Sequence, residues 1–487
     1  MKHFSLSFGT FLFGIVLSLN LLAQNEVDAL RYSQIIPGGS SRFTSTGGAF
    51  GGIGGNISVA GTNPAGLSIF KSSSMDFTPA FGFNTVNNTF GDTKFSDFKG
   101  GLQINNLGFV FAAKTGNESG WKSTALAFNY TRNNSYGQNF YVEGVNNSNS
   151  ITNYFAALGK GKHIGELDDY AEGLAYSAYL IDPDTNSTTS YHSIYDHYGE
   201  SQQFSVARRG NLGEYQLSYA ANYNDHLYLG GTFGVQSVKY KEAISITEKD
   251  ISDTIWNFYS MQYDTYLHTT GSGVNLKLGL IYRPLDWLKI GFAIHTPTLL
   301  DLTDNYSSSL ESHFDTARYS QSLESSDYAS SYKIITPAHY LGSLGFLIRH
   351  SMLLSVEAEM VDYSSIRMSG DDYSYTTENN SIRQNYTATY NLRGGMEYRL
   401  NNFTIRLGGG YYGSPYTSNQ INKNSYTMVY SGGFGFRVEN VFFDFGYYRI
   451  ENTSIYYLYD ANLVSNAPST QITSVTGQFS GSIRVLF

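Results

Sequence analysis

Apolar and polar residues alternate along most of the chain from about Met75 onward, which is the pattern of β-strands with two different faces. The pattern is clearest over residues 473–487. One face of this segment carries Val475, Gly477, Phe479, Gly481, Ile483, Val485 and Phe487, and the other carries Ser474, Thr476, Gln478, Ser480, Ser482 and Arg484. Such a strand is about twice as long as usual in soluble proteins, and it suits a tilted strand that crosses a membrane.

The same alternation recurs in other segments, whose polar faces carry many charged residues. Clear examples are 274–282, 352–358 and 403–411, and aromatic residues such as Tyr411 and Tyr447 gather near strand ends. Lipid outside, a polar lumen inside and aromatic belts at both interfaces explain this arrangement. Because lipid cannot satisfy an open strand edge, the sheet has to close. We therefore predict an all-β fold, a transmembrane antiparallel β-barrel.

Short turns and long polar segments alternate between the predicted strands. Asn224-Asp225 is a tight turn, whereas the polar segments near 87–99 and 146–210 are long. Outer-membrane barrels have short turns on the periplasmic side and long loops outside. Counting strands between these connections predicts about 14, an even number that leaves both ends on the periplasmic side. The barrel then spans 74–487, and its largest extracellular loop lies near 146–210.

The largest loop has local helical character. Within 164–181, the residues Leu167, Tyr170 and Leu174 lie three or four positions apart, and Pro183 follows. This spacing is typical of a helix with one apolar face. It predicts one or two short helices that cap the outer mouth of the barrel.

The N-terminal residues 1–23 have the pattern of a secretory signal peptide. Lys2 and His3 precede the apolar run 8–22, which is too short for a spanning helix, and Ala23 offers a cleavage site. The mature chain is then expected to begin near Gln24 and to reach the bacterial outer membrane. The net charge of -9 argues against a nucleic-acid partner.

Residues 24–73 precede the first predicted strand and include a glycine-rich stretch at 46–66. Eight glycines fall within that stretch, and Asn63-Pro64-Ala65 lies near its end. Gly-Lys-Ser/Thr does not follow, so the stretch is not a phosphate loop, and the spacing does not fit a dinucleotide fingerprint. A flexible tether is one interpretation. We favour a plug, or hatch, inside the barrel, since glycine permits close backbone approach in a crowded lumen.

One short motif connects this stretch to a known family. Gly47-Gly48-Ala49 followed by Asn63-Pro64-Ala65-Gly66-Leu67 resembles the N-terminal hatch of the FadL/TodX family of outer-membrane transporters for hydrophobic compounds. The resemblance implies a 14-stranded barrel, with Gly47, Gly48, Asn63, Pro64, Ala65 and Gly66 as the hatch motif. The C-terminal Phe487 is similar to the aromatic residue that the barrel-assembly machinery reads in such proteins.

The resemblance also implies a transport mechanism. A ligand is captured at the extracellular side, enters a lumenal pocket, shifts the hatch and leaves sideways through a gap at an inward kink in one strand. Asn133, Asn134 and Gly137 in the third predicted strand are the kink candidates, because alternation weakens there. The alternative interpretation is that these residues form the exposed end of the strand.

Charged residues on the predicted inward faces have mixed signs, which favours a lumenal network bracing the hatch over an ion-selective ring. An arginine of this set is suited to an anionic ligand headgroup. The predicted inward residues are Lys277, Arg283, Glu357, Glu359, Arg393, Glu397, Arg399, Arg406, Arg437, Asp444 and Arg484.

Two loop motifs contain residue types that are found in metal or catalytic sites. Asp182, Asp184 and Asn186 resemble the start of a calcium loop, but the later positions lack the required Gly and Glu. His192 and the residues up to His197 contain residue types of a hydrolase or a metal or haem site without the spacing of either. We therefore expect no catalytic residue, no metal site, no cofactor and no enzyme.

The predicted function is passive uptake of hydrophobic compounds such as long-chain fatty acids or aromatic hydrocarbons. A haem-binding receptor or a surface adhesin that uses the large outer loops is the alternative. A barrel enzyme and a plain porin are two further possibilities. The expected partners are the outer-membrane lipid and lipopolysaccharide, a hydrophobic ligand and the barrel-assembly machinery, and we expect a monomer.

Overall fold

The computed structural model describes residues 25–91, 93–195, 197–349 and 351–487. The predicted signal peptide, 1–23, lies outside the described residues. No helix among the described residues is long and apolar enough to span a membrane.

The chain forms a closed, 14-stranded antiparallel β-barrel, which confirms the predicted fold class. The barrel closes between β1 and β21, from Ser74 opposite Leu486 to Thr89 opposite Gln471. Some wall positions consist of two consecutive segments, namely β3 with β4, β10 with β11, β13 with β14, and β15 with β16. The wall strands are β1 (Ser74–Phe90), β2 (Thr93–Lys114), β3 (Trp121–Ser135), β4 (Gln138–Asn146), β7 (Glu200–Tyr223), β8 (Leu227–Lys249), β9 (Phe258–Leu285), β10 (Leu288–His295), β11 (Leu299–Phe314), β13 (Tyr328–Ile335), β14 (His339–Ile348), β15 (Met352–Asp362), β16 (Arg367–Ser369), β17 (Ala388–Leu400), β18 (Phe403–Tyr412), β19 (Thr427–Val438), β20 (Val441–Tyr457) and β21 (Ser469–Leu486).

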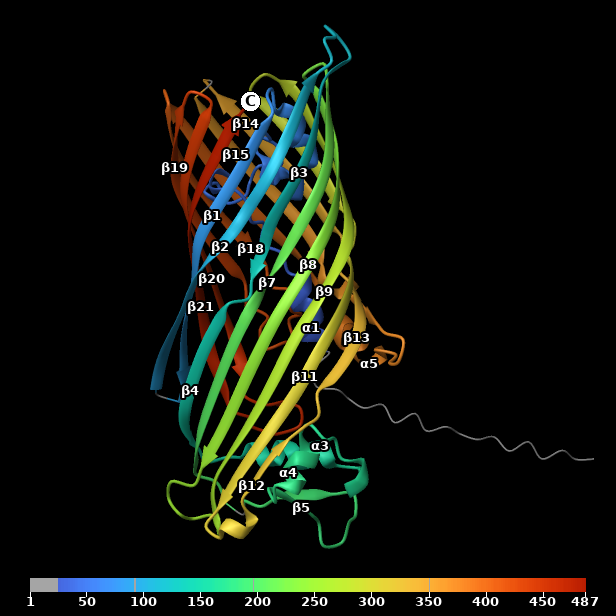
Figure 1. Cartoon of the computed structure of the whole chain (residues 1–487), viewed down its shortest axis with the longest axis vertical. Coiled ribbons are helices and arrows are strands. Elements are labelled where there is room, and N and C mark those ends of the chain that lie inside the picture. Colours follow the sequence, from blue (N-terminus) through green and yellow to red (C-terminus); the bar gives the residue numbers. More distant parts are fainter. Residues whose placement is uncertain (1–24, 92, 196, 350) are drawn as a thin grey trace, which may run out of the picture.

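The two ends of the barrel differ (Figure 1). Short turns and the C-terminus lie at one end, here called the turn end, and the long connections lie at the other, the loop end. The predicted turn at Asn224 and Asp225 lies between β7 and β8, where both residues have positive φ angles of 54° and 59°. Asn and Asp tolerate this left-handed conformation well, and the His226 N–H closes the turn on the carbonyl oxygen of Tyr223.

An apolar band surrounds the turn-end half of the barrel. Its edge towards the loop end is one register row on five neighbouring wall positions: Tyr215, Val235, Val274, Leu299 and Ile335. The next outward-facing row towards the loop end is Gly213, Ser237, Ser272, Asp301 and Lys333. The change from apolar to polar residues between these two successive rows marks where the wall leaves the lipid.

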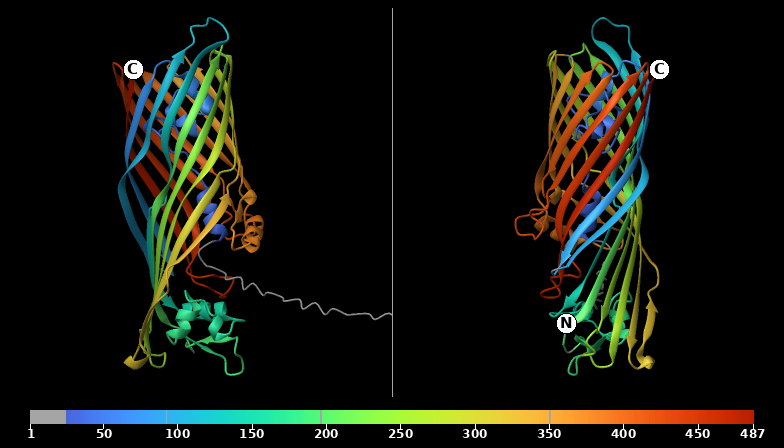
Figure 2. Two further views of the ribbon diagram at one scale, coloured as in Figure 1. Left: turned by 45° about the vertical axis from the view of Figure 1, so that its right-hand side comes forward. Right: turned by 90° about the vertical axis from the view of Figure 1, so that its left-hand side faces the viewer.

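Several strands continue far beyond this band (Figure 2). The sequence pattern predicts loops in these regions instead. β7 and β8 are 24 and 23 residues long and stay paired up to Ser201 opposite Lys249. The polar segment 87–99 is mostly strand, and 200–210 belongs to β7, so the largest connection is 147–199 rather than 146–210. These strand regions are polar on their outer face because water surrounds them. Their sequence therefore resembles that of loops.

The connection 147–199 folds into a small cap at the loop end (Figure 2). It contains α3 (Ile151–Gly159), η3 (Ile164–Glu166), α4 (Glu172–Ser177), β5 (Ile181–Pro183) and β6 (Tyr191–Ser193). Two of the short helices, η3 and α4, lie within the predicted range 164–181, and α3 precedes it. Their apolar side chains form one cluster with residues of the extended strands, as Phe155 and Leu174 do with Phe204 and Ile246.

Three neighbouring wall positions are interrupted at one height. The breaks are 296–298 between β10 and β11, 336–338 between β13 and β14, and η5 (Tyr363–Ser365) between β15 and β16. Pro297 and Pro337 explain the first two, because proline has no backbone N–H for a strand ladder. Short η4 (Ala317–Tyr319), β12 (Gln321–Glu324) and α5 (Thr376–Asn385) complete the connections at the loop end.

Candidate functional site

The N-terminal segment lies inside the barrel, mainly in its turn-end half (Figure 1). It contains four short helices: α1 (Glu26–Ser33), α2 (Ser41–Thr44), η1 (Ile57–Gly61) and η2 (Pro64–Ile69). Each begins after a polar side chain that accepts a hydrogen bond from a backbone N–H of the first turn. These four cap residues are Asn25, Ser40, Asn56 and Asn63. The sequence thus produces short capped turns rather than a flexible tether.

The predicted hatch motif sits against glycines of the wall. Asn63 donates hydrogen bonds from Nδ2 to the carbonyl oxygens of Gly51, at 2.8 Å, and of Leu280 on β9, at 3.2 Å. A Cβ at Gly230 of β8 would lie 2.5 Å from the carbonyl carbon of Pro64. The motif can approach the wall this closely only because the facing wall residue has no side chain.

The glycine pair Gly47-Gly48 forms a second close contact. Both residues have positive φ angles, 64° and 75°, which favour glycine. A Cβ at Gly47 would lie 2.7 Å from the carbonyl oxygen of Gly409 in β18. Gly66 packs on Gly54 within the segment itself, where a Cβ would lie 2.8 Å from the Gly54 Cα. All six hatch-motif residues therefore lie in tight contacts, whereas their role as a movable gate stays a prediction.

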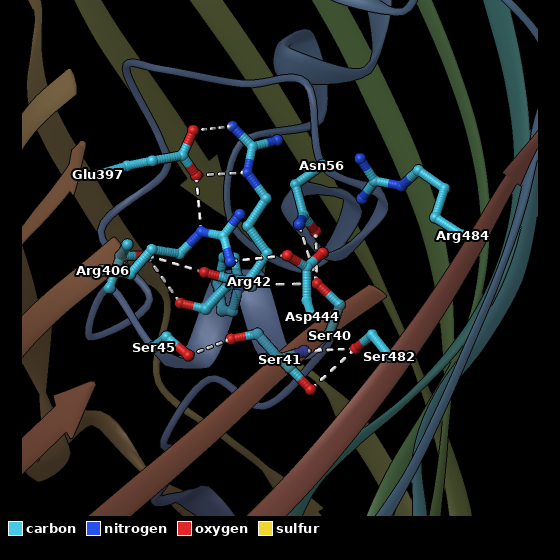
Figure 3. A network of polar contacts seen from close by, with 12 residues as sticks. Ser40, Ser41, Arg42, Ser45, Asn56, Glu397, Arg406, Asp444, Ser482 and Arg484 are labelled. Atoms are coloured by element: carbon cyan, nitrogen blue, oxygen red, sulfur yellow. Dashed lines mark hydrogen bonds and ion pairs between the residues drawn. The ribbon is translucent and has the colours of Figure 1, made fainter. Parts of the chain in front are cut away.

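Ion pairs hold the middle of the N-terminal segment to the wall (Figure 3). Arg42 of α2 donates to both carboxylate oxygens of Glu397 on β17, at 2.7 and 3.0 Å. Arg406 on β18 contacts Glu397 at 2.8 Å and Asp444 on β20 at 2.7 Å. The backbone N–H of Ser41 donates to Ser482 Oγ at 2.7 Å. All these side chains are largely buried, so each charge needs its partner.

A second buried network lies on the neighbouring part of the wall. Arg393 contacts both Glu357, at 3.0 Å from Nε, and Glu359, at 2.9 Å from Nη1. The other oxygen of Glu357 accepts a hydrogen bond from the backbone N–H of Gly51 at 2.9 Å. His339 Nδ1 lies 2.7 Å from Glu359. The predicted lumenal network thus exists and contacts the N-terminal segment directly.

Two charges assigned to this network lie elsewhere, and a third lies at its edge. Arg283 pairs with Asp286 in its own turn, and Arg437 donates to the Glu439 carbonyl oxygen. Arg399 is more than half exposed and lies 4.0 Å from Glu397. Alternation identifies a face of a strand but not the height along it, so it cannot separate lumenal charges from charges at strand ends.

The wall has an unpaired stretch between β2 and the β3–β4 position, here called the slit. Backbone pairing of β2 with β3 stops at Asn106 opposite Thr131, and the register of β3 against β7 shifts between Arg132 and Asn134. Pairing of this wall position with β7 resumes at Gln138 opposite Arg208. The kink candidates Asn133, Asn134 and Gly137 all fall in this stretch. Residues 93–105 of β2 pair only with β1.

Side chains, rather than backbone hydrogen bonds, connect the two edges of the slit. Ser135 Oγ lies 3.0 Å from Gln103 Oε1, and Lys99 Nζ donates to Asn139 Oδ1 at 3.2 Å and to the carbonyl oxygen of Arg208 at 2.6 Å. Asn134 donates to the carbonyl oxygen of Gln34, so the slit also contacts the segment between α1 and α2. Sequence reasoning missed this polar set because its members are far apart in the chain.

A lumenal cavity of ≈ 510 Å³ lies directly behind the slit. Its lining combines Ile36 and Thr44 of the N-terminal segment with wall residues such as Phe83, Tyr448 and Ile450. The charged residues of this lining are Lys99, Arg132 and Arg209, with no carboxylate among the described residues that line it. An open groove on the outer face of the wall shares Leu102, Gln103 and Arg132 with the cavity. The cavity and the outer groove therefore meet at the slit.

The loop motifs form no common site. His192 Nδ1 lies 2.9 Å from Asp184 Oδ1, and Ser190 also contacts Asp184, so these hydrogen bonds lower the pKa of Asp184 from its ordinary value. His197 contacts the Thr254 carbonyl oxygen instead, and Asp196 lies outside the described residues. Within the described ranges, no group of three or more His, Cys, Asp or Glu residues could hold a metal ion.

Comparison with known proteins identifies the fold. No protein-family model matches the chain, and no curated protein matches it. A crystal structure of a Pseudomonas aeruginosa FadL homologue is similar over 93% of this chain and 99% of that chain, with 13% identity and a TM-score of 0.58. The P. putida toluene transporter TodX is similar over 93% and 99%, with 10% identity and a TM-score of 0.54. The chain therefore has the fold of the FadL- and TodX-type outer-membrane channels.

Proposed function

We propose that this protein is an outer-membrane channel of the FadL type for passive uptake of hydrophobic compounds. Its ligand enters at the loop end, occupies the cavity between the N-terminal segment and the wall, and leaves sideways through the slit. The lumenal cavity meets an outer groove at the slit, where backbone pairing between β2 and the β3–β4 position is missing, and this meeting carries the proposal. The apolar band supports the outer-membrane location.

The segment between α1 and α2 is the part of the hatch that controls access to the slit. Ile36 and Gly38 line the cavity, and the Ile36 backbone N–H lies 3.4 Å from Asn134 Oδ1 at the slit edge. Residues 41–66 are held by buried ion pairs and by glycine contacts, as described above. We therefore infer that ligand entry displaces residues 34–39 more readily than the rest of the hatch.

The lining of the cavity favours an amphiphilic acid. Lys99 and Arg132 face it, with no carboxylate among the described residues that line it, beside apolar side chains such as Ile36 and Ile450. A carboxylate ligand would gain charge-assisted hydrogen bonds from an arginine or a lysine. A neutral hydrocarbon would leave these cations without that partner. Long-chain fatty acids therefore fit the cavity better than monoaromatic hydrocarbons.

Uptake by liposomes that contain the purified protein tests this function. We expect a long-chain fatty acid to bind and to cross faster than in protein-free liposomes. The matched fatty alcohol, which has the same chain and no charge, should bind more weakly. Lack of binding and passage for acids, alkanes and aromatic compounds alike would refute the uptake function. Equal binding of acid and alcohol would refute only the assignment of the ligand class.

The haem-receptor or adhesin alternative depends on the cap, and it stays a prediction. Titration of haem into the full-length protein and into a variant without residues 147–199 separates the two functions. Haem binding that disappears with the cap would favour the receptor. Fatty-acid binding that survives removal of the cap would favour the channel.

A further inference from the structure

A group of cations lies on the outer surface of the barrel just beyond the apolar band. Arg209 of β7 and Lys239 and Lys241 of β8 are exposed and point outward, and we call them the basic patch. No ion pair or hydrogen bond between described residues involves these three side chains. The chain carries a net charge of -9, so a local group of unpaired cations is unusual for it.

The basic patch places like charges next to each other. Arg209 lies directly opposite Lys241 in the β7–β8 ladder, and Lys241 lies opposite His268 of β9. Like charges at directly opposite positions destabilise a sheet. Burial and the neighbouring Lys241 lower the pKa of His268. The adjacent Glu242 points into the lumen, where it pairs with Arg208, so it does not neutralise the patch.

The patch lies at the height of lipid headgroups. Lys239 is four residues, or about 13 Å along the strand, beyond the band-edge residue Val235, and Arg209 is six residues beyond Tyr215, or about 20 Å. The tilt of barrel strands reduces these heights to roughly 10–15 Å above the hydrocarbon layer. A large, charged headgroup at the outer surface reaches this level.

An apolar groove of ≈ 380 Å³ lies on the turn-end side of the patch, on the lipid-facing side of the same wall. It spans β2, β3, β7 and β8, and its lining includes Leu107, Phe109, Phe128, Leu217 and Phe233. A hydrocarbon chain in this groove would bury apolar surface of the chain and of the groove. The groove and the patch share β7 and β8, so one molecule could contact both.

We propose that the groove and the basic patch together bind one lipid of the outer leaflet that carries phosphate groups on its headgroup. The acyl chain lies in the groove, and the phosphates contact Lys239, Lys241 and Arg209. This site rests on the proposed function only for the location of the barrel in the outer membrane. It lies beside the slit, since Tyr130 and Tyr215 line both this groove and the outer groove at the slit.

Native mass spectrometry of the full-length protein in detergent tests the site. The probe is bis-phosphorylated lipid A, which is compared with dephosphorylated lipid A and with inorganic phosphate. We expect the K239Q/K241Q variant to bind the phosphorylated lipid about tenfold more weakly than the wild type, since each lysine near an anionic headgroup contributes to binding. The matched control is K160Q/K249Q, which removes the same charge from exposed loop-end positions outside the patch.

The comparison of lipids on the wild-type protein requires no variant to fold. Equal binding of dephosphorylated and bis-phosphorylated lipid A would overturn the proposal, and so would unchanged affinity of K239Q/K241Q. Saturable binding of inorganic phosphate at the same concentrations would indicate a free-anion site instead and would also overturn it. The assay contains no transported ligand, so a failure of the uptake function does not affect its result.

Discussion

At the scale of single residues, buried charges connect the N-terminal segment to the wall. Arg393 contacts Glu357 and Glu359, and Glu357 also accepts a hydrogen bond from Gly51. The alternation of the sequence predicts that these side chains face the lumen. It does not predict their partners, because each partner comes from a neighbouring strand whose register is set by the whole sheet.

Replacement of Arg393 by methionine should destabilise the barrel strongly. The substitution leaves Glu357 and Glu359 buried without their cation, which typically costs about 3–5 kcal/mol. Urea unfolding in detergent, followed by the heat-modifiable shift on gels, measures the loss. Arg437→Gln is the control, because Arg437 lies at a turn outside the network. Similar stability of both variants would contradict the importance of the lumenal network.

Replacement of Gly230 by alanine should loosen the contact between the hatch and the wall. Its Cβ would meet the backbone of Pro64 at 2.5 Å, so the hatch motif has to move away from β8. Gly231→Ala is a matched control, since a Cβ there would have its nearest contact at an ordinary 3.5 Å, to Leu278. We expect higher ion conductance in planar bilayers for G230A and wild-type conductance for G231A. Wild-type conductance of both variants would contradict tight seating of the motif.

At the scale of elements, the wall has two kinds of interruption with different consequences. At the Thr-Pro breaks, threonine hydroxyls replace part of the missing ladder: Leu276 N–H donates to Thr296 Oγ1 at 3.0 Å, and Thr298 N–H donates to Thr336 Oγ1 at 2.9 Å. At the slit, only flexible side chains cross between β2 and the β3–β4 position. The slit is therefore the interruption that can open at low cost.

A covalent bridge across the slit should block transport. The sequence contains no cysteine, so Gln103→Cys with Ser135→Cys introduces one reactive pair, which a short bismaleimide can join. We expect the cross-linked protein to lose uptake into liposomes while the unlinked variant retains it. The control pair is Thr303→Cys with Ser331→Cys, whose parent hydroxyls lie 3.0 Å apart on a fully paired part of the wall. Full uptake by the protein cross-linked at the slit would exclude lateral exit there.

At the scale of the whole molecule, the barrel closes without help from the N-terminal segment. The β1–β21 pairing extends over most of both strands, and the 14 wall positions are joined around the whole circumference. The segment fills a polar lumen, and the cap and the extended strands enlarge the loop end. The structure therefore separates the wall that spans the lipid from the parts that occupy or cover its interior.

Deletion of residues 46–67 should leave a folded barrel that conducts ions. The strands satisfy their own backbone groups, so the wall does not require the deleted residues. The wall would then keep buried charges such as Glu397 and Arg406 facing a water-filled lumen. We expect a clear increase of conductance in planar bilayers with retained heat-modifiability. Unchanged conductance would contradict the role of this stretch as a plug.

The sequence by itself determined the barrel, its number of strands and a lumen lined by charge, because a two-residue period assigns each side chain to the lipid or to the interior. The weakened alternation at Asn133, Asn134 and Gly137 falls in the stretch where β2–β3 pairing has stopped, while their role as a kink stays a prediction. Only the tertiary structure decided how far the strands extend beyond the lipid, because the polar outer faces of these regions resemble loops in the sequence. It alone decided which charges meet and that the cavity reaches the slit, because these contacts join residues from distant parts of the chain.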